Sequence, residues 1–153
     1  MSIALSETFH IGMAVEDIDQ CCKQIGEDLN LDWLPIKSFD PLPFWTPEEG
    51  LREISVKATY SRQGPQRIEI VQGTSIFYDP NRLPDSRHVG IWVHDLIEEA
   101  TRLIDKGWIV LAAGDEPSAG YGTIAYLSPP FPGLMVELVS KQLEPMMNEW
   151  FSE

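Results

Sequence analysis

The sequence is poor in cysteine and in basic residues, and it lacks a long hydrophobic run. Its two cysteines, Cys21 and Cys22, are adjacent, which is a poor arrangement for a structural disulfide and gives no CxxC metal spacing. No stretch reaches the roughly 18 apolar residues of a membrane span, and the first ten residues lack the basic and apolar regions of a targeting segment. We therefore expect a cytoplasmic protein that does not bind a membrane.

The charge is strongly one-sided. Lysine and arginine together number 11 against 24 acidic residues, and the formal net charge is −13. Such a field repels phosphate backbones and anionic lipid, so we expect no nucleic-acid partner. The hydrophobic share of 43% is close to the globular average, and 153 residues suit one domain or two small modules that share a core.

The chain contains an internal repeat. The segment HIGMAVED at 10–17 recurs as HVGIWVHD at 88–95, an offset of 78 residues, and RIEIV at 67–71 is echoed by MVELV at 135–139. The first offset is close to half of the chain length. The pattern therefore indicates a duplication.

Each half has the same predicted order of elements. A strand leads into a helix with an acidic N-cap, at Asp17 with Gln20 three residues on, and at Asp95 with Glu98. Strand candidates then follow at 33–39, 51–60 and 66–72 in the first half and at 108–113, 121–128 and 134–140 in the second. The sequence thus predicts an α+β fold of two βαβββ modules in one domain.

Proline-rich stretches mark the expected boundaries. We expect an extra loop at 39–50, module one at about 8–74, a linker at 75–86 and module two at about 87–141. The tail at 142–153 carries a short apolar stripe, which we expect to cover the domain's own sheet or a partner subunit.

Strand parity places two histidines and two glutamates on one face. Because side chains alternate along a strand, each of them points away from apolar neighbours that can pack under the helices. These residues are His10, Glu69, His88 and Glu137. If the modules pair about a pseudo-twofold axis, the four converge, and a set of two imidazoles and two carboxylates suits Zn²⁺, Fe²⁺, Co²⁺, Mn²⁺ or Ni²⁺. We expect small neighbours such as Gly12 and Gly90 to leave room for a bound molecule.

These motifs resemble the vicinal oxygen chelate superfamily, which has the glyoxalase and bleomycin-resistance fold, over Phe9 to Lys141. The resemblance rests on the segments HIG at 10–12, IEIV at 68–71, SRHVG at 86–90 and GLMVELV at 133–139. The PEEG turn at 47–50 is similar to one in the methylmalonyl-CoA epimerase branch. The resemblance implies a glyoxalase-like curved mixed sheet around a metal-binding cavity, with a divalent ion held by His10, Glu69, His88 and Glu137. Some epimerases have Gln in place of Glu69, and many have a second His in place of Arg87.

The resemblance also implies a reaction. A divalent cation at a carbonyl oxygen stabilises the enolate that forms when the neighbouring carbon loses a proton. The family's two acid–base carboxylates match Glu137 and Glu48, although Glu49 is adjacent to the latter. Among candidate substrate contacts, Trp92 shares the face of His88, and Arg67 is a cation for the phosphates of an acyl-CoA. We expect a metal-dependent epimerase or isomerase that acts on a small molecule, either an acyl-CoA or a hydrophobic carbonyl compound, and that forms a homodimer.

Other functions of the same fold remain open. A glyoxalase-type lyase needs basic residues to recognise glutathione, and these are sparse here. An extradiol dioxygenase uses two His and one carboxylate around Fe²⁺, and the extra Glu69 weighs against it. A non-catalytic protein that binds a hydrophobic small molecule between the halves is the alternative from another class, and it would need no metal.

Overall fold

The computed structural model describes residues 5–82 and 85–153. Eight strands and three helices follow in the order β1 (Thr8–Ala14), α1 (Ile18–Leu29), β2 (Lys37–Thr46), β3 (Gly50–Tyr60), β4 (Arg67–Gly73), β5 (His88–Val93), α2 (Leu96–Asp105), β6 (Ile109–Ala113), β7 (Ile124–Ser128), β8 (Met135–Ser140) and α3 (Glu144–Phe151). This order repeats βαβββ and then adds α3. The predicted α+β fold of two such modules is confirmed.

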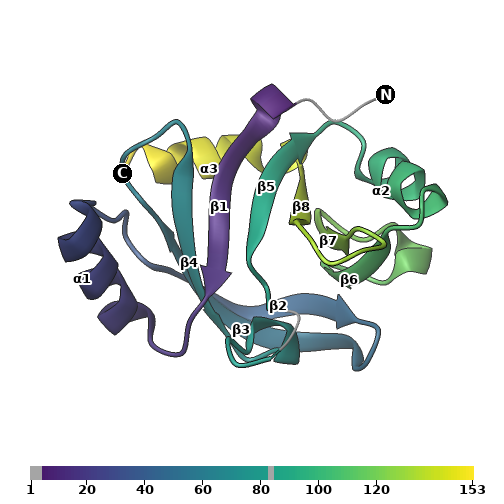
Figure 1. Cartoon of the computed structure of the whole chain (residues 1–153), viewed down its shortest axis with the longest axis horizontal. Helices are drawn as coiled ribbons and strands as arrows, with labels where there is room; N and C mark the ends of the chain where they lie inside the picture. Colours follow the sequence, from purple (N-terminus) through teal and green to yellow (C-terminus); the bar gives the residue numbers. More distant parts are fainter. Residues whose placement is uncertain (1–4, 83–84) are drawn as a thin grey trace.

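The strands form one curved sheet that closes on itself. Its order is β1-β4-β3-β2-β6-β7-β8-β5, so that each module contributes four neighbouring strands. Within each module the first and last strands are parallel, β1 with β4 and β5 with β8. The modules meet where β1 and β5 run antiparallel, side by side at the centre of Figure 1. The two halves thus pair within a single chain.

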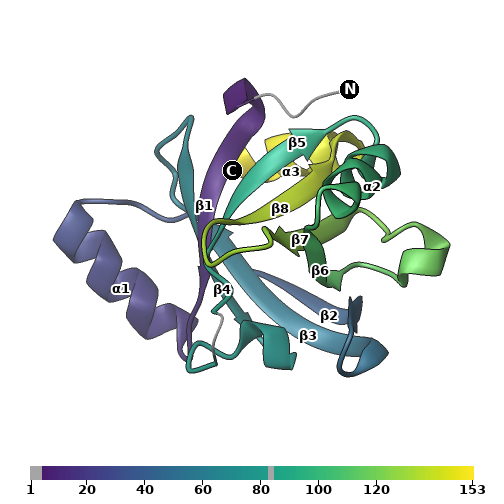
Figure 2. The ribbon, with the colours of Figure 1, turned by 45° about the vertical axis from the view of Figure 1, so that its right-hand side comes forward.

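Helices α1 and α2 cover the outer face of the sheet, one on each module (Figures 1 and 2). Ile18 and Cys22 of α1 pack against Ile70 of β4, whereas α2 packs on the outward side chains of β5, β7 and β8. Both predicted caps form, since Asp17 Oδ1 accepts a hydrogen bond from the Gln20 amide and Asp95 Oδ1 from the Glu98 amide, each at 3.0 Å. The helices therefore cover much of the apolar outer side of these strands, although Ile11 of β1 is 52% exposed.

The C-terminal tail folds onto the chain's own sheet. Helix α3 lies behind β1 and β4 in Figure 1 and places Met147 and Trp150 in the main hydrophobic cluster inside the sheet. Trp150 is 2% exposed, and its indole N–H donates to the Pro35 carbonyl oxygen at 2.9 Å. Of the two expectations for the tail, the structure thus shows cover of the chain's own sheet.

The prediction of a loop at 39–50 is wrong. Most of it lies in β2 and the turn to β3, which together form a long hairpin. Two features accommodate the prolines. The register of the hairpin shifts between Phe39 and Leu42, around Pro41, and β2 pairs with β6 only through Trp45 and Ala113. Because most of the β6 side of β2 has no ladder partner there, the missing amide hydrogens of Pro41 and Pro43 cost little.

The structure also bears on the expectations of no membrane-spanning segment and no structural disulfide. None of the helices within 5–82 and 85–153 is long and apolar enough to cross a bilayer. Cys21 and Cys22 are both free thiols. Burial, with a smaller effect of the neighbouring Cys21, raises the pKa of Cys22 to about 11, so this thiol is unreactive at neutral pH.

Candidate metal centre

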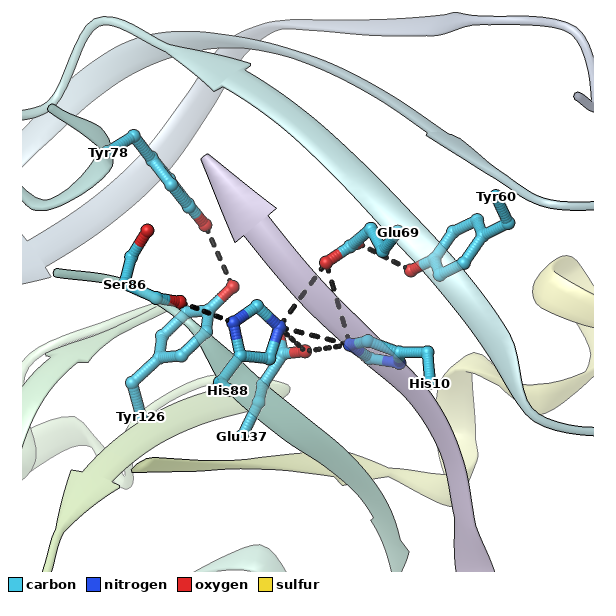
Figure 3. Close-up of polar contacts among 8 residues, drawn as sticks. All are labelled: His10, Tyr60, Glu69, Tyr78, Ser86, His88, Tyr126 and Glu137. Carbon is cyan, nitrogen blue, oxygen red and sulfur yellow. Dashed lines mark hydrogen bonds and ion pairs between the residues drawn. The ribbon is translucent and has the colours of Figure 1, made fainter. Parts of the chain in front are cut away.

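Four donor atoms converge where the two modules meet. The imidazole Nε2 atoms of His10 and His88 are 3.1 Å apart. Glu137 Oε1 lies 3.0 and 3.5 Å from them, and Glu69 Oε1 lies 3.5 and 3.3 Å from them. Ligands about 2.0–2.2 Å from one ion stand roughly 2.9–3.5 Å from one another, so these separations suit a single cation. Figure 3 shows the four side chains pointing toward a common point.

The strand register explains this convergence. In the antiparallel pair of β1 and β5, His10 lies opposite Gly90, and Gly12 lies opposite His88. A Cβ atom at Gly12 would collide with the His88 ring and lie 2.7 Å from Glu69 Oε1, and a Cβ atom at Gly90 would collide with the His10 ring. The space that we expected these glycines to leave for a bound molecule is therefore occupied by the imidazole from the other module.

The His88 ring is held in an orientation suited to a ligand. Its Nδ1–H donates to the Ser86 carbonyl oxygen at 2.7 Å, which leaves the Nε2 lone pair for a cation. Burial alone would lower the pKa of His88, but the carboxylates of Glu137 and Glu69 outweigh it and raise that pKa to about 10. The carboxylates thus favour positive charge at this point, and either a proton or a divalent cation supplies it.

The two carboxylates are buried, 7% exposed for Glu69 and 6% for Glu137. Burial opposes the ionisation of Glu137, yet the imidazoles of His10 and His88 hold its pKa well below the usual range. Glu69 Oε1 is fully buried and accepts no hydrogen bond. Because a buried acceptor without a hydrogen bond is costly, a cation bound among the four atoms would stabilise this oxygen. The residues present therefore fit a divalent metal ion.

A tyrosine lies directly across the sheet from each of the two carboxylate donors. Tyr60 faces Glu69 across β3 and β4, and Tyr126 faces Glu137 across β7 and β8. Tyr60 Oη donates to Glu69 Oε2 at 2.7 Å, whereas Tyr126 Oη lies 2.9 Å from Tyr78 Oη instead. The duplication thus gives both glutamates a tyrosine neighbour, but only Glu69 is held by one.

A chamber of about 460 Å³ opens beside the donors. We call it the inner chamber. It is lined by Glu69 and Glu137, by other residues of β2, β3 and β4, by Ile124 and Tyr126 of β7, and by Met146, Met147 and Trp150 of α3. Most of the remaining lining is aliphatic or aromatic. The volume is in the range of small-molecule sites.

Glu48 does not lie with the four donors. Its carboxylate is 51% exposed and pairs with the Arg82 guanidinium at 2.9 Å. It lines a separate small cavity with Phe77 and Leu111, and the Phe77 ring lies against Tyr126, with ring centres 4.5 Å apart. The neighbouring Glu49 pairs with Arg52 at 3.2 Å. A catalytic role for either carboxylate stays a prediction.

The two predicted substrate contacts also lie away from the chamber walls. Trp92 is 8% exposed and stacks on Phe9, with ring centres 4.2 Å apart. Arg67 donates to the carbonyl oxygens of Ser61 and Arg62, and its guanidinium lies 4.2 Å from the Phe151 ring centre. Neither is among the described residues that line the inner chamber.

Sequence reasoning gave no individual role to the residues that surround the four donors. Tyr60 and Tyr126 occupy matching places in the two modules, 9 residues before Glu69 and 11 residues before Glu137, so the repeat carried a signal for them. Ser86 contributes a backbone carbonyl, which no residue pattern marks. Tyr78 lies in the linker, and only the folded chain brings it to Tyr126.

Comparison with known proteins places this geometry in a family. The family model of the Glyoxalase/Bleomycin resistance protein/Dioxygenase superfamily matches residues 9–126, which include His10, Glu69 and His88. No curated protein matches the sequence.

Solved structures share the fold at low sequence identity. A hypothetical protein from Bacillus halodurans has a TM-score of 0.58 at 21% identity, covering 88% of this chain and 93% of its own. Methylmalonyl-CoA epimerase from Mycobacterium tuberculosis has a TM-score of 0.55 at 17% identity, with 92% and 91% covered. A Streptomyces coelicolor methylmalonyl-CoA epimerase variant in complex with 2-nitronate-propionyl-CoA reaches 0.51 at 19% identity, with 91% and 95% covered. The family match, the closed sheet of two βαβββ modules and the four converging donors lead to one conclusion: this chain belongs to the glyoxalase/bleomycin resistance protein/dioxygenase superfamily.

Proposed function

We propose that the protein is a metal-dependent isomerase or epimerase that moves a proton at the carbon next to a carbonyl group, as the methylmalonyl-CoA epimerases of the same fold do. The observation that carries this proposal is the buried set of two imidazoles and two carboxylates beside the inner chamber. When bound, a divalent ion supplies a Lewis acid that stabilises negative charge on the carbonyl oxygen. His10, Glu69, His88 and Glu137 would hold it.

The two carboxylates differ in a way that assigns their roles. Glu69 Oε2 accepts the Tyr60 hydroxyl hydrogen bond, so this side chain is fixed as a ligand. Within the described chain, Glu137 meets polar partners only through Oε1, at His10 and His88. Its second oxygen is left to take a proton from a substrate in the inner chamber. Glu137 is therefore the acid–base group of the proposal.

The chamber itself favours proton transfer. Its walls are mainly apolar, and α3 covers it, so a bound substrate displaces water from the reacting carbon. The four buried donors sit on strands whose outer faces are packed under helices, which limits their movement. Displacing water in this way strengthens each electrostatic interaction with the developing charge.

The second proton carrier of an epimerase is assigned to Glu48 by resemblance, and it remains a proposal. An enzyme with two carriers inverts its substrate, whereas one carrier alone exchanges the proton with solvent on one face. We expect Glu48→Gln to abolish inversion while one-sided exchange persists. If Glu48→Gln inverts its substrate as fast as the unaltered protein, the assignment is wrong and the acid comes from another group.

Deuterium exchange tests the main proposal. The Co²⁺-loaded protein is incubated in D₂O with methylmalonyl-CoA and, separately, with 1-phenyl-1,2-propanedione, an uncharged diketone, and exchange at the carbon next to the carbonyl group is followed by NMR. We expect exchange of at least one compound, lost on metal removal and in Glu137→Gln. Glu27→Gln, an exposed change on α1, serves as the control. Unchanged exchange in Glu137→Gln would remove this residue as the base.

The apolar lining also favours a second candidate, a binding protein that sequesters a hydrophobic molecule. Such a protein would bind ligand in the inner chamber without needing the four donors. Full ligand binding in a protein that takes up no stoichiometric metal would support this second candidate over an enzyme. The lyase and dioxygenase alternatives are less well supported, because no Lys or Arg is among the described chamber residues and because two carboxylates converge rather than one.

We further propose that the protein acts in the cytoplasm as a homodimer. The free cysteine pair is consistent with a reducing compartment. Exposed hydrophobic side chains such as Ile109 and Leu134, at 57% and 59% exposure, are available to an interface. Analytical ultracentrifugation tests the dimer, and a single species at the mass of one chain, 17.3 kDa, would refute it.

A further inference from the structure

The inner chamber is built for an apolar molecule. Val56, Ala58 and Val71 of the sheet line it together with Met147 and Trp150 of α3. Its volume of about 460 Å³ suits a compound of modest size. Apolar walls of this kind bind hydrocarbon or aromatic surface and give nothing to a phosphate or a peptide backbone.

The charged residues that line the chamber also favour an uncharged ligand. No Lys or Arg is among its described lining residues, while three carboxylates are, Glu69, Glu137 and Asp115. A divalent ion held by two neutral imidazoles and two carboxylates makes a centre with no net charge. Several basic residues elsewhere are occupied by acidic partners, such as Arg82 with Glu48 and Lys37 with Glu153. An anionic nucleotide or glutathione moiety would therefore find no cationic partner in the chamber.

The apolar lining of the chamber includes one pair of uncharged polar groups. The hydroxyl groups of Tyr78 and Tyr126 are 2.9 Å apart, and both residues line the chamber. A phenol keeps its hydrogen at neutral pH, so both hydroxyl groups can donate. Two hydroxyl groups carry two hydrogens, and the bond between them uses one. The pair thus retains a donor within the chamber.

The tyrosine pair lies next to two of the four donor residues. Tyr126 faces Glu137 across β7 and β8, and its ring meets the His88 ring edge-on with centres 5.0 Å apart. In Figure 3 the Tyr78–Tyr126 contact lies on the side of His88 away from His10 and Tyr60. Because Glu69, Glu137 and both tyrosines line the same chamber, a molecule bound there with one oxygen near the carboxylates can present a second polar atom to the tyrosine pair.

We propose that the inner chamber selects an uncharged carbonyl compound with a mainly apolar body, and that the Tyr78–Tyr126 hydroxyl pair donates a hydrogen bond to its second oxygen. This inference rests on the proposed function for the placement of the first oxygen at the metal centre. It differs from an acyl-CoA substrate, which the resemblance to the epimerases implies. The tyrosine pair would then determine specificity.

Competition for the chamber tests the substrate class. The uncharged fluorophore N-phenyl-1-naphthylamine is bound to the Co²⁺-loaded protein and then displaced by 1-phenyl-1,2-propanedione or by methylmalonyl-CoA. We expect displacement by the diketone and none by the thioester at equal concentration. Displacement by the thioester alone would overturn the proposal, as would displacement by neither compound. Ala58→Leu, which narrows the chamber, should weaken fluorophore binding, and Ala119→Leu on an exposed turn should leave it unchanged.

The double variant Tyr78→Phe with Tyr126→Phe tests the hydrogen bond. It keeps both rings, so we expect unchanged fluorophore affinity and a diketone affinity lower by about 3- to 10-fold, the effect of one neutral hydrogen bond. Tyr121→Phe, in the cluster under α2, is the matched control. Equal diketone affinity in the double variant would refute the role of the pair. If that variant does not fold, the competition on the unaltered protein still decides the substrate class.

This binding assay is independent of turnover. If the diketone binds but no proton exchange occurs with any compound, the proposed function fails while the substrate class of the chamber stands. If exchange occurs with methylmalonyl-CoA and the diketone does not displace the fluorophore, the substrate class fails while the proposed function stands.

Discussion

Removing one hydroxyl group tests how the protein positions its candidate metal ligands. Tyr60 Oη donates to Glu69 Oε2 at 2.7 Å, and both residues are buried, at 5% and 7% exposure. In Tyr60→Phe the ring remains, and with it the contacts to Trp150 and Phe151, whose ring centres lie 5.1 and 5.2 Å away. The substitution therefore removes a hydrogen bond with little change in packing.

The size of the effect follows from two independent considerations. A hydrogen bond to a charged group contributes about 1.5–3 kcal/mol. Loss of a group that orients a metal ligand typically lowers metal affinity by roughly 10- to 100-fold, which corresponds to about 1.4–2.7 kcal/mol. The two ranges overlap, so we expect Tyr60→Phe to bind Co²⁺ about 10- to 100-fold more weakly.

The assay is a Co²⁺ titration of the metal-free protein, followed by the visible absorption of the bound ion in competition with a chelator. Tyr126→Phe is the matched control, since Tyr126 faces Glu137 in the same way but bonds to Tyr78 instead. We expect its Co²⁺ affinity to stay within about 3-fold of the unaltered protein. Equal affinity in Tyr60→Phe and the unaltered protein would refute the positioning role, as would an equal loss in both variants.

Three further predictions follow from the site and the core. Gly12→Ala forces a Cβ atom against the His88 ring, so it should lower the free energy of unfolding by about 1–3 kcal/mol and prevent stoichiometric metal uptake. In the control Gly133→Ala the new Cβ atom meets only ordinary contacts, and neither stability nor metal uptake should change. Urea unfolding measures the stability and metal analysis measures the uptake. Trp150→Ala should lower the free energy of unfolding in urea by about 3–5 kcal/mol, because the Trp150 side chain is only 2% exposed. The control Phe131→Ala, at a side chain that is 65% exposed, should lower it by about 0.5 kcal/mol or less. Equal losses of stability in the two variants would contradict the packing of α3. A divalent metal at 100 times its Kd should stabilise the fold by about 2.7 kcal/mol, which corresponds to a rise in Tm of roughly 5–11 °C in calorimetry. A chelator should reverse this rise. A Tm that does not respond to metal would argue against a metal site in the folded state.

Much of the fold was predictable because the duplication makes each half a check on the other. Alternation in the strands around His10 and His88 identified the buried outer faces, and the capping residues Asp17 and Asp95 located the helix starts. The hairpin at 39–50 was missed because Pro41 and Pro43 read as strand breakers. They are accommodated by a register shift and by the scarce pairing of β2 with β6, which are tertiary features.

Within the candidate site, only the convergence of the four donors was predictable. Strand parity and the repeat identified His10, Glu69, His88 and Glu137, since these are properties of the strands themselves. The roles of Tyr60, Ser86 and Tyr78 depend on which segments the sheet brings together, and periodicity carries no such information. The same limit explains Glu48, whose turn motif gives no indication of its pairing with Arg82.

The central claim is that the two modules bring four donors around one divalent cation. Metal analysis of the purified protein, with Co²⁺ titration of the chelator-treated form, tests it most directly. We expect one ion per chain with high affinity, a visible spectrum typical of nitrogen and oxygen ligands, and loss of that spectrum in His10→Ala and in His88→Ala. A protein that takes up no stoichiometric Co²⁺, Zn²⁺, Ni²⁺, Mn²⁺ or Fe²⁺, or that binds equally well without these imidazoles, would contradict the account.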